Sequence, residues 1–479
     1  MSTEKPTVWV VGDAMLDVTI TAKSFRPSPE DPAAPVLTPT AGERVCAAGG
    51  AANLAMNLLA QNCDVQLCAP WAESSWASAK LHKLVVGPPD TGIRWPSYTP
   101  GGDPWLRTSG TTTKTRYITN NRLVARVDDD HDSGPAMPPA VIVGPKPAAV
   151  VLTDYGRGAI TAGAVNEWAS FCRRFNIPMY GDPKKGRAEL WSCRDTELAA
   201  MVLNWEEAEE FADWSADMSD TASALSMGAL ILKSSPEYGR VIVKRGIYGS
   251  MLYRNGGSLI DVIQPVLPRD HVADRQGAGD TYLAAMIAAA ARGVEMPLAC
   301  RLASAAAGVA VSRPGTSVVS LDDALDACKP YLPADITVTQ LKAMGYEIGY
   351  TNGCFDFHLH PGHLSTLRYA ASLCDFLFVG VDSDSRVKKL KGDGRPVVSA
   401  EDRVAQLEAV KGVYKAFVFD DHEEALRSVR CDVLVKGEDW KEKGVPEAEM
   451  LKEWGGRLEF APAVSAPHVT DRLRAMGID

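Results

Sequence analysis

The chain has 479 residues, which is too long for one ordinary domain core and suits two or three domains. Its composition, with 46% hydrophobic and 23% charged residues, is that of a soluble globular protein, and no run of about 18 apolar residues is present to span a membrane. The net charge of −10 argues against a general nucleic-acid-binding protein, but small anionic substrates stay open because local Lys and Arg clusters would bind them.

The first half of the chain alternates strand-like apolar runs with Ala-rich helical stretches, a pattern typical of an α/β domain with a largely parallel sheet. The start is polar up to Pro6 and leads into an apolar run that is too short and wrongly flanked for a signal peptide. We predict that this run is the first buried strand. The strands predicted in this half are residues 8–11, 150–153, 178–181, 201–204 and 240–244.

Carboxylates and glycines follow the first strand. Asp13 and Asp17 come just past it, and ligands of open α/β sheets bind at the carboxyl ends of strands, so both are candidates to hold sugar hydroxyls. Gly49 and Gly50 precede an apolar helix predicted at residues 54–60 and would bring Asn53 to the same ligand. Asp13 and Asp17, each taken alone, also fit a simple turn or helix-cap role.

The most informative segment reads DRQGAGDT, residues 274–281, and precedes an apolar run. Glycines followed by a helical pattern predict a helix N-terminus, whose backbone N–H groups and dipole favour a phosphate or a developing negative charge. Gly277 and Gly279 allow close approach of the backbone. Asp280 in the first turn suits a general base for a sugar hydroxyl that attacks the γ-phosphate of ATP. The alternative is a Gly-rich turn in which Asp280 only caps the helix.

A second α/β series starts near Glu347. Between the two series lies a stretch that contains Pro330 and Pro333, where we place the domain boundary. We expect a first domain over residues 1–325, a linker over 326–345 and a second domain over 346–479. The strands predicted in the second domain are residues 347–351, 376–382, 416–419 and 433–436.

Histidines dominate the start of the second domain. His360 and His363 flank a Pro-Gly turn between a predicted strand and a predicted helix. Imidazoles at this spacing can face one phosphate group and donate hydrogen bonds to it as charge grows, and helix N-terminal amides add to them. Two alternatives are a metal site that includes His358, which no Cys or carboxylate set at ligand spacing completes, and a plain His-rich surface turn.

Ordered motifs over roughly residues 5–325 resemble the ribokinase-like (PfkB) carbohydrate kinases, and most closely the kinase half of the bifunctional heptose-7-phosphate kinase/heptose-1-phosphate adenylyltransferase family. The resemblance implies that Asp280 is the catalytic base and that Gly277, Ala278 and Gly279 form the anion hole. The matching stretches include GDAMLD (12–17), GGAANLAMNL (49–58), TKTRYI (113–118), LTDYGRGAI (152–160), GDPKKG (181–186), NWEEAE (204–209) and GAGDTY (277–282).

Further binding residues follow from the same resemblance. Asn204 and Glu207 of the NxxE motif would help to organise the magnesium–phosphate region. Lys114, Arg116 and Arg126 are candidates to clamp a sugar phosphate, with a solvated basic strand edge as the alternative.

Residues 346–479 resemble the HxGH nucleotidyltransferases, and most closely the adenylyltransferase half of the same family. The resemblance implies a smaller Rossmann-like domain in which His360 and His363 bind the nucleotide phosphates. The other residues that it assigns to the substrate or nucleotide site are Asn352, Phe355, Lys391, Arg403, Lys436 and Asp439. The matching stretches are NGCFD (352–356), VGVDSD (379–384), KKLKGDGRPV (388–397), EDRVAQLEAV (401–410) and LVKGEDW (434–440).

The chain departs from this family in several places. Gln276 stands where the family has Thr, and residues 87–104 form an apparent inserted loop. The family has two residues between its Phe-Asp pair and the first histidine of the motif. Here three residues separate Asp356 from His360, so His358 is the alternative first histidine. The stretch 464–470, VSAPHVT, replaces a Ser/Thr-rich phosphate-binding motif.

We therefore expect a cytoplasmic bifunctional enzyme with a ribokinase-like domain followed by a Rossmann-like HxGH nucleotidyltransferase domain. It would use ATP with Mg²⁺ to phosphorylate heptose 7-phosphate at C1 and then form ADP-heptose from the sugar 1-phosphate. We assign no direct protein ligand to the metal, and we expect a homodimer with no nucleic-acid or membrane partner. The alternative is a kinase of another sugar phosphate whose second domain uses CTP or is a degenerate nucleotide-binding module.

Overall fold

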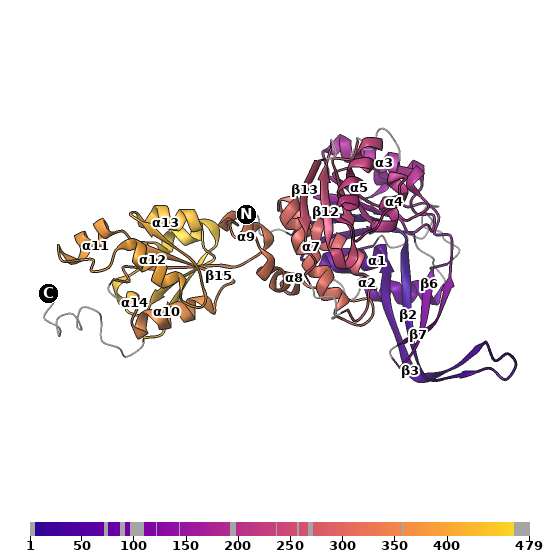
Figure 1. Ribbon diagram of the computed structural model, residues 1–479, viewed down its shortest axis with the longest axis horizontal. Helices are drawn as coiled ribbons and strands as arrows, with labels where there is room; N and C mark the ends of the chain where they lie inside the picture. The colour runs from indigo at the N-terminus through magenta and orange to yellow at the C-terminus, as the bar shows by residue number, and fades with distance from the viewer. Residues whose placement is uncertain are drawn as a thin grey trace. The chain divides into compact units, whose positions relative to one another are not determined.

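The computed structural model describes residues 5–70, 75–86, 92–95, 110–120, 122–142, 144–191, 198–235, 237–255, 258–266, 272–356 and 359–463, and for residues 40–43 the backbone alone. The chain divides into two compact units, the first ending at Pro333 and the second beginning at Ala334. The division falls within residues 326–345, the expected linker, which also contains helix α9 (Val338–Met344). Both units are α/β (Figure 1).

The first unit is built on a nine-stranded sheet in the part of the chain that the structure describes. Seven neighbouring strands of this sheet pair in parallel, namely β11, β10, β9, β8, β1, β4 and β5. Strands β12 and β13 are antiparallel to their neighbours. In sheet order the strands are β13 (Ser258–Ile263), β12 (Ser250–Arg254), β11 (Arg240–Lys244), β10 (Ala200–Asn204), β9 (Met179–Asp182), β8 (Ala149–Thr153), β1 (Thr7–Gly12), β4 (Asp64–Cys68) and β5 (Ile93–Arg94). The predicted α/β class and all five strands predicted in this half are confirmed.

Helices cover this sheet and bury its central strands, so β8 is buried along its whole length and apolar up to Thr153. A hydrophobic core that includes Trp9, Trp168 and Trp191 among many aliphatic side chains packs between the sheet and helices such as α3 and α5. The helices of the unit are α1 (Ala51–Ala60), α2 (Trp76–Val86), α3 (Ala162–Phe175), α4 (Trp205–Ala212), α5 (Thr221–Ser234), α6 (Ala278–Ala291), α7 (Met296–Val311) and α8 (Leu321–Cys328).

A second sheet of the first unit was not predicted from the sequence. The chain leaves β1 and enters the long strand β2 (Ala14–Pro27), which pairs with β3 (Pro35–Gly50) and β6 (Thr113–Thr119). Strand β7 (Arg122–Asp129) completes it at the other side of β6. Asp17 therefore lies within a strand, opposite Lys114 of β6, and not in a turn after β1. Figure 1 shows β2 and β3 as long paired strands.

The second unit holds a five-stranded parallel sheet among the residues described, in the order β16 (Val413–Phe419), β15 (Phe376–Asp382), β14 (Ile348–Gly353), β17 (Val433–Gly437) and β18 (Arg457–Ala461). The chain runs outward from β14 to β16 and then returns to β17 on the other side of β14. Ligands of open α/β sheets bind at such a switch point, here between β14 and β17. The Rossmann-like prediction is confirmed.

In the described part of the second unit, the helices other than α9 follow strand β14 along the chain. They are α10 (Pro361–Ala371), α11 (Asp384–Lys391), α12 (Ala400–Glu408), α13 (His422–Val429), α14 (Trp440–Lys443) and α15 (Ala448–Leu451). Within the described residues of both units, no helix is long and apolar enough to cross a membrane.

Candidate active sites

A cavity of about 180 Å³ opens in the first unit between the second sheet and the N-terminus of α6. The structure brings to it predicted residues from several widely separated motifs. The residues that line it are Met15, Asp17, Gly50, Lys114, Arg116, Tyr155, Gln276, Gly277, Gly279, Asp280 and Thr316.

The N-terminus of α6 presents Asp280 to this cavity. Gly277 precedes the helix in the left-handed region, at φ 71°, which favours glycine, and the helix begins at Ala278. One carboxylate oxygen of Asp280 accepts a hydrogen bond from Asn53 Nδ2 at 2.6 Å, and the other accepts one from the Tyr155 hydroxyl. Burial raises the pKa of Asp280 to about 6, although both hydrogen bonds lower it. A carboxyl group with such a pKa suits general-base work near neutral pH.

Basic and acidic side chains meet on the opposite wall. Arg116 Nη1 lies 2.8 Å from Asp17 Oδ1, and Thr316 Oγ1 donates to Asp17 Oδ2 at 3.4 Å. Lys114 Nζ lies 5.7 Å from the centre of the Tyr155 ring, and burial lowers the pKa of Lys114. Gly49 packs on the same carboxylate, because a Cβ atom there would come within 2.9 Å of Asp17 Oδ2.

Asp13 takes a different place from the one we expected. Its buried carboxylate accepts hydrogen bonds from the backbone N–H groups of Tyr155, Arg157 and Ala159 at 2.9–3.1 Å. It does not line the cavity, so it fixes the loop that carries Tyr155 instead of facing a sugar. Arg126 also stays away from the cavity, since its exposed guanidinium pairs with Asp128.

Asn204 and Glu207 form a capping box at the start of α4. Asn204 Oδ1 accepts from the backbone N–H of Glu207, and Glu207 Oε2 accepts from the backbone N–H of Asn204 at 2.7 Å. Burial raises the pKa of Glu207 to about 7, and the neighbouring Lys244 opposes that rise. The arrangement puts a carboxylate beside the carboxyl ends of β9, β10 and β11.

Three residues at this first site had no role assigned from the sequence. Tyr155 and Asp182 lie in stretches that match the kinase family, LTDYGRGAI and GDPKKG, yet nothing in the spacing indicated their contacts. Lys244 ends β11 and has no motif signal. Asp182 is held by the Thr153 hydroxyl at 2.9 Å and lies 3.5 Å from Lys244 Nζ.

The paired histidines of the second unit lie at the start of α10, as the turn suggested. His360 caps the helix: its Nδ1 accepts from the backbone N–H groups of Gly362 at 3.1 Å and His363 at 3.4 Å. A neutral ring that accepts at Nδ1 carries its proton on Nε2. The His360 and His363 rings stack with centroids 3.7 Å apart, and Phe355 packs edge-on against His363 at 5.1 Å. The structure therefore places these three predicted residues together.

Arg403 has a place that the sequence did not indicate. Its guanidinium is fully buried and donates to the backbone oxygens of Cys354 at 2.6 Å and Asp382 at 2.8 Å, and it pairs with Asp384 at 2.5 Å. These contacts make it a support for the loops that follow β14 and β15, and not a group that flanks the nucleotide. Lys391 ends α11 with an exposed side chain.

Lys436 and Asn352 meet at the switch point between β14 and β17. Lys436 Nζ donates to Asn352 Oδ1 at 2.6 Å and lies 3.2 Å from Glu447 Oε1. His422 Nδ1 lies 2.7 Å from Asn352 Nδ2 and 3.7 Å from the same Glu447 oxygen. Burial lowers the pKa of Lys436, although Glu447 opposes this.

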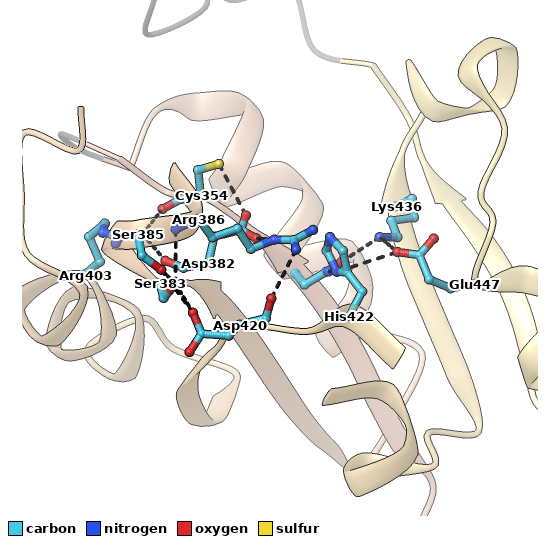
Figure 2. A network of polar contacts seen from close by, with 11 residues as sticks. Cys354, Asp382, Ser383, Ser385, Arg386, Arg403, Asp420, His422, Lys436 and Glu447 are labelled. Carbon is cyan, nitrogen blue, oxygen red and sulfur yellow. Dashed lines mark hydrogen bonds and ion pairs between the residues drawn. The ribbon is translucent and has the colours of Figure 1, made fainter. Parts of the chain in front are cut away.

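Figure 2 shows Lys436, Glu447 and His422 together, next to a second cluster around Arg386 and Asp382. Asp439 lies apart from both clusters on the surface, where it pairs with Lys443 at 2.6 Å. His358 and the stretch 464–470, on which two expectations rested, lie outside the described residues, as does most of the inserted loop 87–104.

Known proteins match both units. The pfkB carbohydrate kinase family matches residues 164–324, and the cytidylyltransferase-like family matches residues 350–464. The first unit resembles Escherichia coli phosphofructokinase-2 in complex with substrates and products, with a TM-score of 0.52 and 16% identity over 68% of this chain and 99% of that one. It also resembles Arabidopsis thaliana ribokinase complexed with ribose and ATP, with a TM-score of 0.51 and 19% identity over the same shares. At these identities the likeness shows the ribokinase-like fold alone.

A match along the whole chain gives the family. The bifunctional protein HldE of Geobacter sulfurreducens is 31% identical over 484 residues, which cover 96% of this chain and 94% of that protein. The two matched domain families follow each other in one polypeptide, and each provides a transferase unit, one a carbohydrate kinase and one a nucleotidyltransferase. The chain therefore belongs to the HldE family of bifunctional proteins.

Proposed function

We propose that the first unit transfers the γ-phosphoryl group of ATP to C1 of heptose 7-phosphate, and that the second unit joins the heptose 1-phosphate to AMP, giving ADP-heptose. A separate phosphatase must remove the 7-phosphate between the two steps. The observation that carries the first step is the Asp280 carboxylate, held on both oxygens at the N-terminus of α6 and open to a cavity with basic walls.

In the kinase reaction, Asp280 accepts the proton of the C1 hydroxyl as that oxygen bonds to the γ-phosphorus. The bond from this phosphorus to the β–γ bridging oxygen breaks, and ADP leaves. Backbone N–H groups of Gly277, Ala278 and Gly279 at the helix start stabilise the transferred charge. Lys114 and Arg116, which line the same cavity, hold the 7-phosphate, and Asp17 with Asn53 orients the sugar and the base.

ATP enters as its magnesium complex, in which the cation neutralises phosphate charge. Glu207 and Asp182 offer hard carboxylate oxygens at the strand ends beside α6, and Asn204 positions Glu207 through the capping box. These side chains would hold a magnesium ion next to the phosphates, where it would neutralise their charge.

In the second reaction, an oxygen of the sugar 1-phosphate attacks the α-phosphorus of ATP, and pyrophosphate leaves. His360 and His363 donate hydrogen bonds to the α-phosphate, and Phe355 holds His363 in place. Lys391, Lys436 and Asn352 meet the remaining phosphates at the edge of the sheet. Asp439, which follows β17 on the surface, would flank the nucleotide from outside these clusters. We place this enzyme in the cytoplasm, as a homodimer, where ATP and sugar phosphates are available.

The test incubates the full chain with Mg·ATP and a panel of sugar phosphates and follows the products by mass spectrometry. Heptose 7-phosphate should gain the mass of one phosphoryl group, about 80 Da, because it becomes a heptose 1,7-bisphosphate. Heptose 1-phosphate with ATP should release pyrophosphate and give ADP-heptose. If pyrophosphate is released with CTP but not with ATP, the nucleotide substrate of the second unit is CTP. If no nucleotide gives pyrophosphate, the second unit is a nucleotide-binding module without transferase activity.

A further inference from the structure

Lys244 is a cation that the chemistry above leaves without a role. It ends β11, directly opposite Asn204 at the end of β10, and Asp182 ends the next strand, β9. The carboxyl ends of these parallel strands form the edge where ligands of such sheets bind. The Lys244 side chain is 17% exposed, so its ammonium group is held inside the site and not in bulk solvent.

The ammonium group faces the N-terminal turn of α6. A Cβ atom on Gly279 would lie 3.6 Å from Lys244 Nζ, so this cation lies next to a glycine of the proposed anion hole. Lys244 is not among the residues that line the sugar cavity, whereas Gly279 and Asp280 are. Lys244 therefore reaches the helix start from outside the cavity wall, from the edge where the strands end.

Asp182 of β9 is the carboxylate that lies next to the Lys244 ammonium group. Asp182 is itself fixed by the Thr153 hydroxyl at 2.9 Å and lies 3.5 Å from Lys244 Nζ. The long contact to Asp182 leaves the ammonium protons in a position to meet further acceptors, which phosphate oxygens would supply.

We propose that Lys244 is a further catalytic residue of the kinase unit, which binds the γ-phosphoryl group at the N-terminus of α6 and neutralises its charge during transfer. The inference rests on the proposed kinase function. Lys244 keeps its three protons throughout: the sugar oxygen bonds to phosphorus, the bridging oxygen leaves with ADP, and the sugar proton goes to Asp280. The competing role is structural, with Lys244 acting only as the counter-ion of Asp182 and Glu207.

The experiment compares Lys244→Met and Lys244→Arg with a matched control, Lys185→Met. Lys185 is also an ion-paired lysine, 3.3 Å from Glu206, but it is 60% exposed at the surface. Lys244→Met should lower kinase kcat by about 10²–10³-fold, as for other preorganised donors, with little change in KM. Lys244→Arg keeps the charge and should recover part of that rate, and Lys185→Met should keep the full rate. Thermal unfolding of each variant shows whether it is folded.

Binding of a transition-state analogue separates the two roles. ADP with aluminium fluoride mimics the transferring phosphoryl group, so Lys244→Met should weaken its binding far more than the binding of ATP. Equal weakening of both ligands would refute the proposal and leave Lys244 the counter-ion role, and unchanged turnover would refute it as well. This readout needs no sugar acceptor. If Lys244→Met and Asp280→Asn both keep full turnover, the proposed kinase site is wrong. If Lys244→Met keeps full turnover but Asp280→Asn does not, the proposed site remains and Lys244 has no part in it.

Discussion

The surroundings of Asp280 suit its carboxylate to the proposed role of base for a sugar hydroxyl. Asp280→Asn keeps the shape of the side chain but cannot accept the proton. Kinase turnover should therefore fall by about 10²–10⁴-fold, the usual range for the loss of general-base catalysis, while ATP binding persists. Steady-state ADP release and calorimetry of ATP binding measure the two effects, and near-normal turnover would remove Asp280 from this role.

The pH dependence of the kinase follows from the same carboxylate. Asp280 must be ionised to accept a proton, and its pKa is raised to about 6, chiefly by burial. As pH falls below this value, the ionised fraction falls, so kcat/KM should drop about tenfold per pH unit and level off above it. A rate profile from pH 5 to 8 that is flat across this range would contradict the assignment.

Tyr155 should set the position of that inflection. Its hydroxyl donates to Asp280 and favours the ionised form, so Tyr155→Phe should move the inflection to higher pH. Tyr331→Phe is the matched control, because the Tyr331 hydroxyl also donates a hydrogen bond, to the backbone oxygen of Val266, but does not line the cavity. An inflection that stays in place in Tyr155→Phe would reduce the tyrosine to a packing role.

The site was predictable from the sequence where a residue stands in a motif that itself builds local structure. Gly277 and Asp280 share one helix start, so their spacing indicated both the turn and the position of the carboxylate in the first turn. Tyr155 was not predictable, since its partner lies 125 positions further along the chain. Asp13 was misplaced for the same reason: the N–H groups of the Tyr155 loop, which donate hydrogen bonds to its carboxylate, are more than 140 positions away.

Secondary-structure elements differ in how well they can be predicted from the sequence. Strands such as β8 are buried on both faces and read as continuous apolar runs, which is why the parallel sheets were predicted. The sheet of β2, β3, β6 and β7 has one partly exposed face and mixed side chains, and β2 meets β6 about 97 positions later in sequence, as Leu16 with Thr113. No local pattern specifies such a pairing.

The start of helix α10 holds both histidines of the proposed nucleotide site. His363 lies in its first turn, stacked on the cap residue His360, so both rings depend on the same helix start. His363→Ala should lower pyrophosphate release from ATP and sugar 1-phosphate by about 10²–10³-fold, the loss typical of one such donor, while the kinase rate stays unchanged. A coupled pyrophosphate assay measures this.

His358→Ala serves as the comparison for that helix start. It should leave pyrophosphate release intact, because His360 is the ring that caps α10 and stacks on His363. A larger loss in His358→Ala than in His360→Ala would show that the register of the turn is wrong.

At the scale of the molecule, the two units should work apart. A fragment ending at Pro333 keeps every residue that lines the sugar cavity and should fold and phosphorylate alone. A shorter fragment ending at Ser320 loses α8, whose Leu325 and Cys328 are buried, and should unfold at a lower temperature. Thermal unfolding and kinase assays of both fragments test this, and an inactive longer fragment beside an active full chain would mean that the units share a core.

The division at Pro333 also bears on how a cell would control the route. Since one polypeptide carries both units, every ribosome that completes a chain makes one kinase centre and one nucleotidyl-transfer centre. Changing expression therefore scales both activities together and cannot shift their ratio. The balance between the two steps must lie in their rate constants, or in the supply of the phosphatase that acts between them.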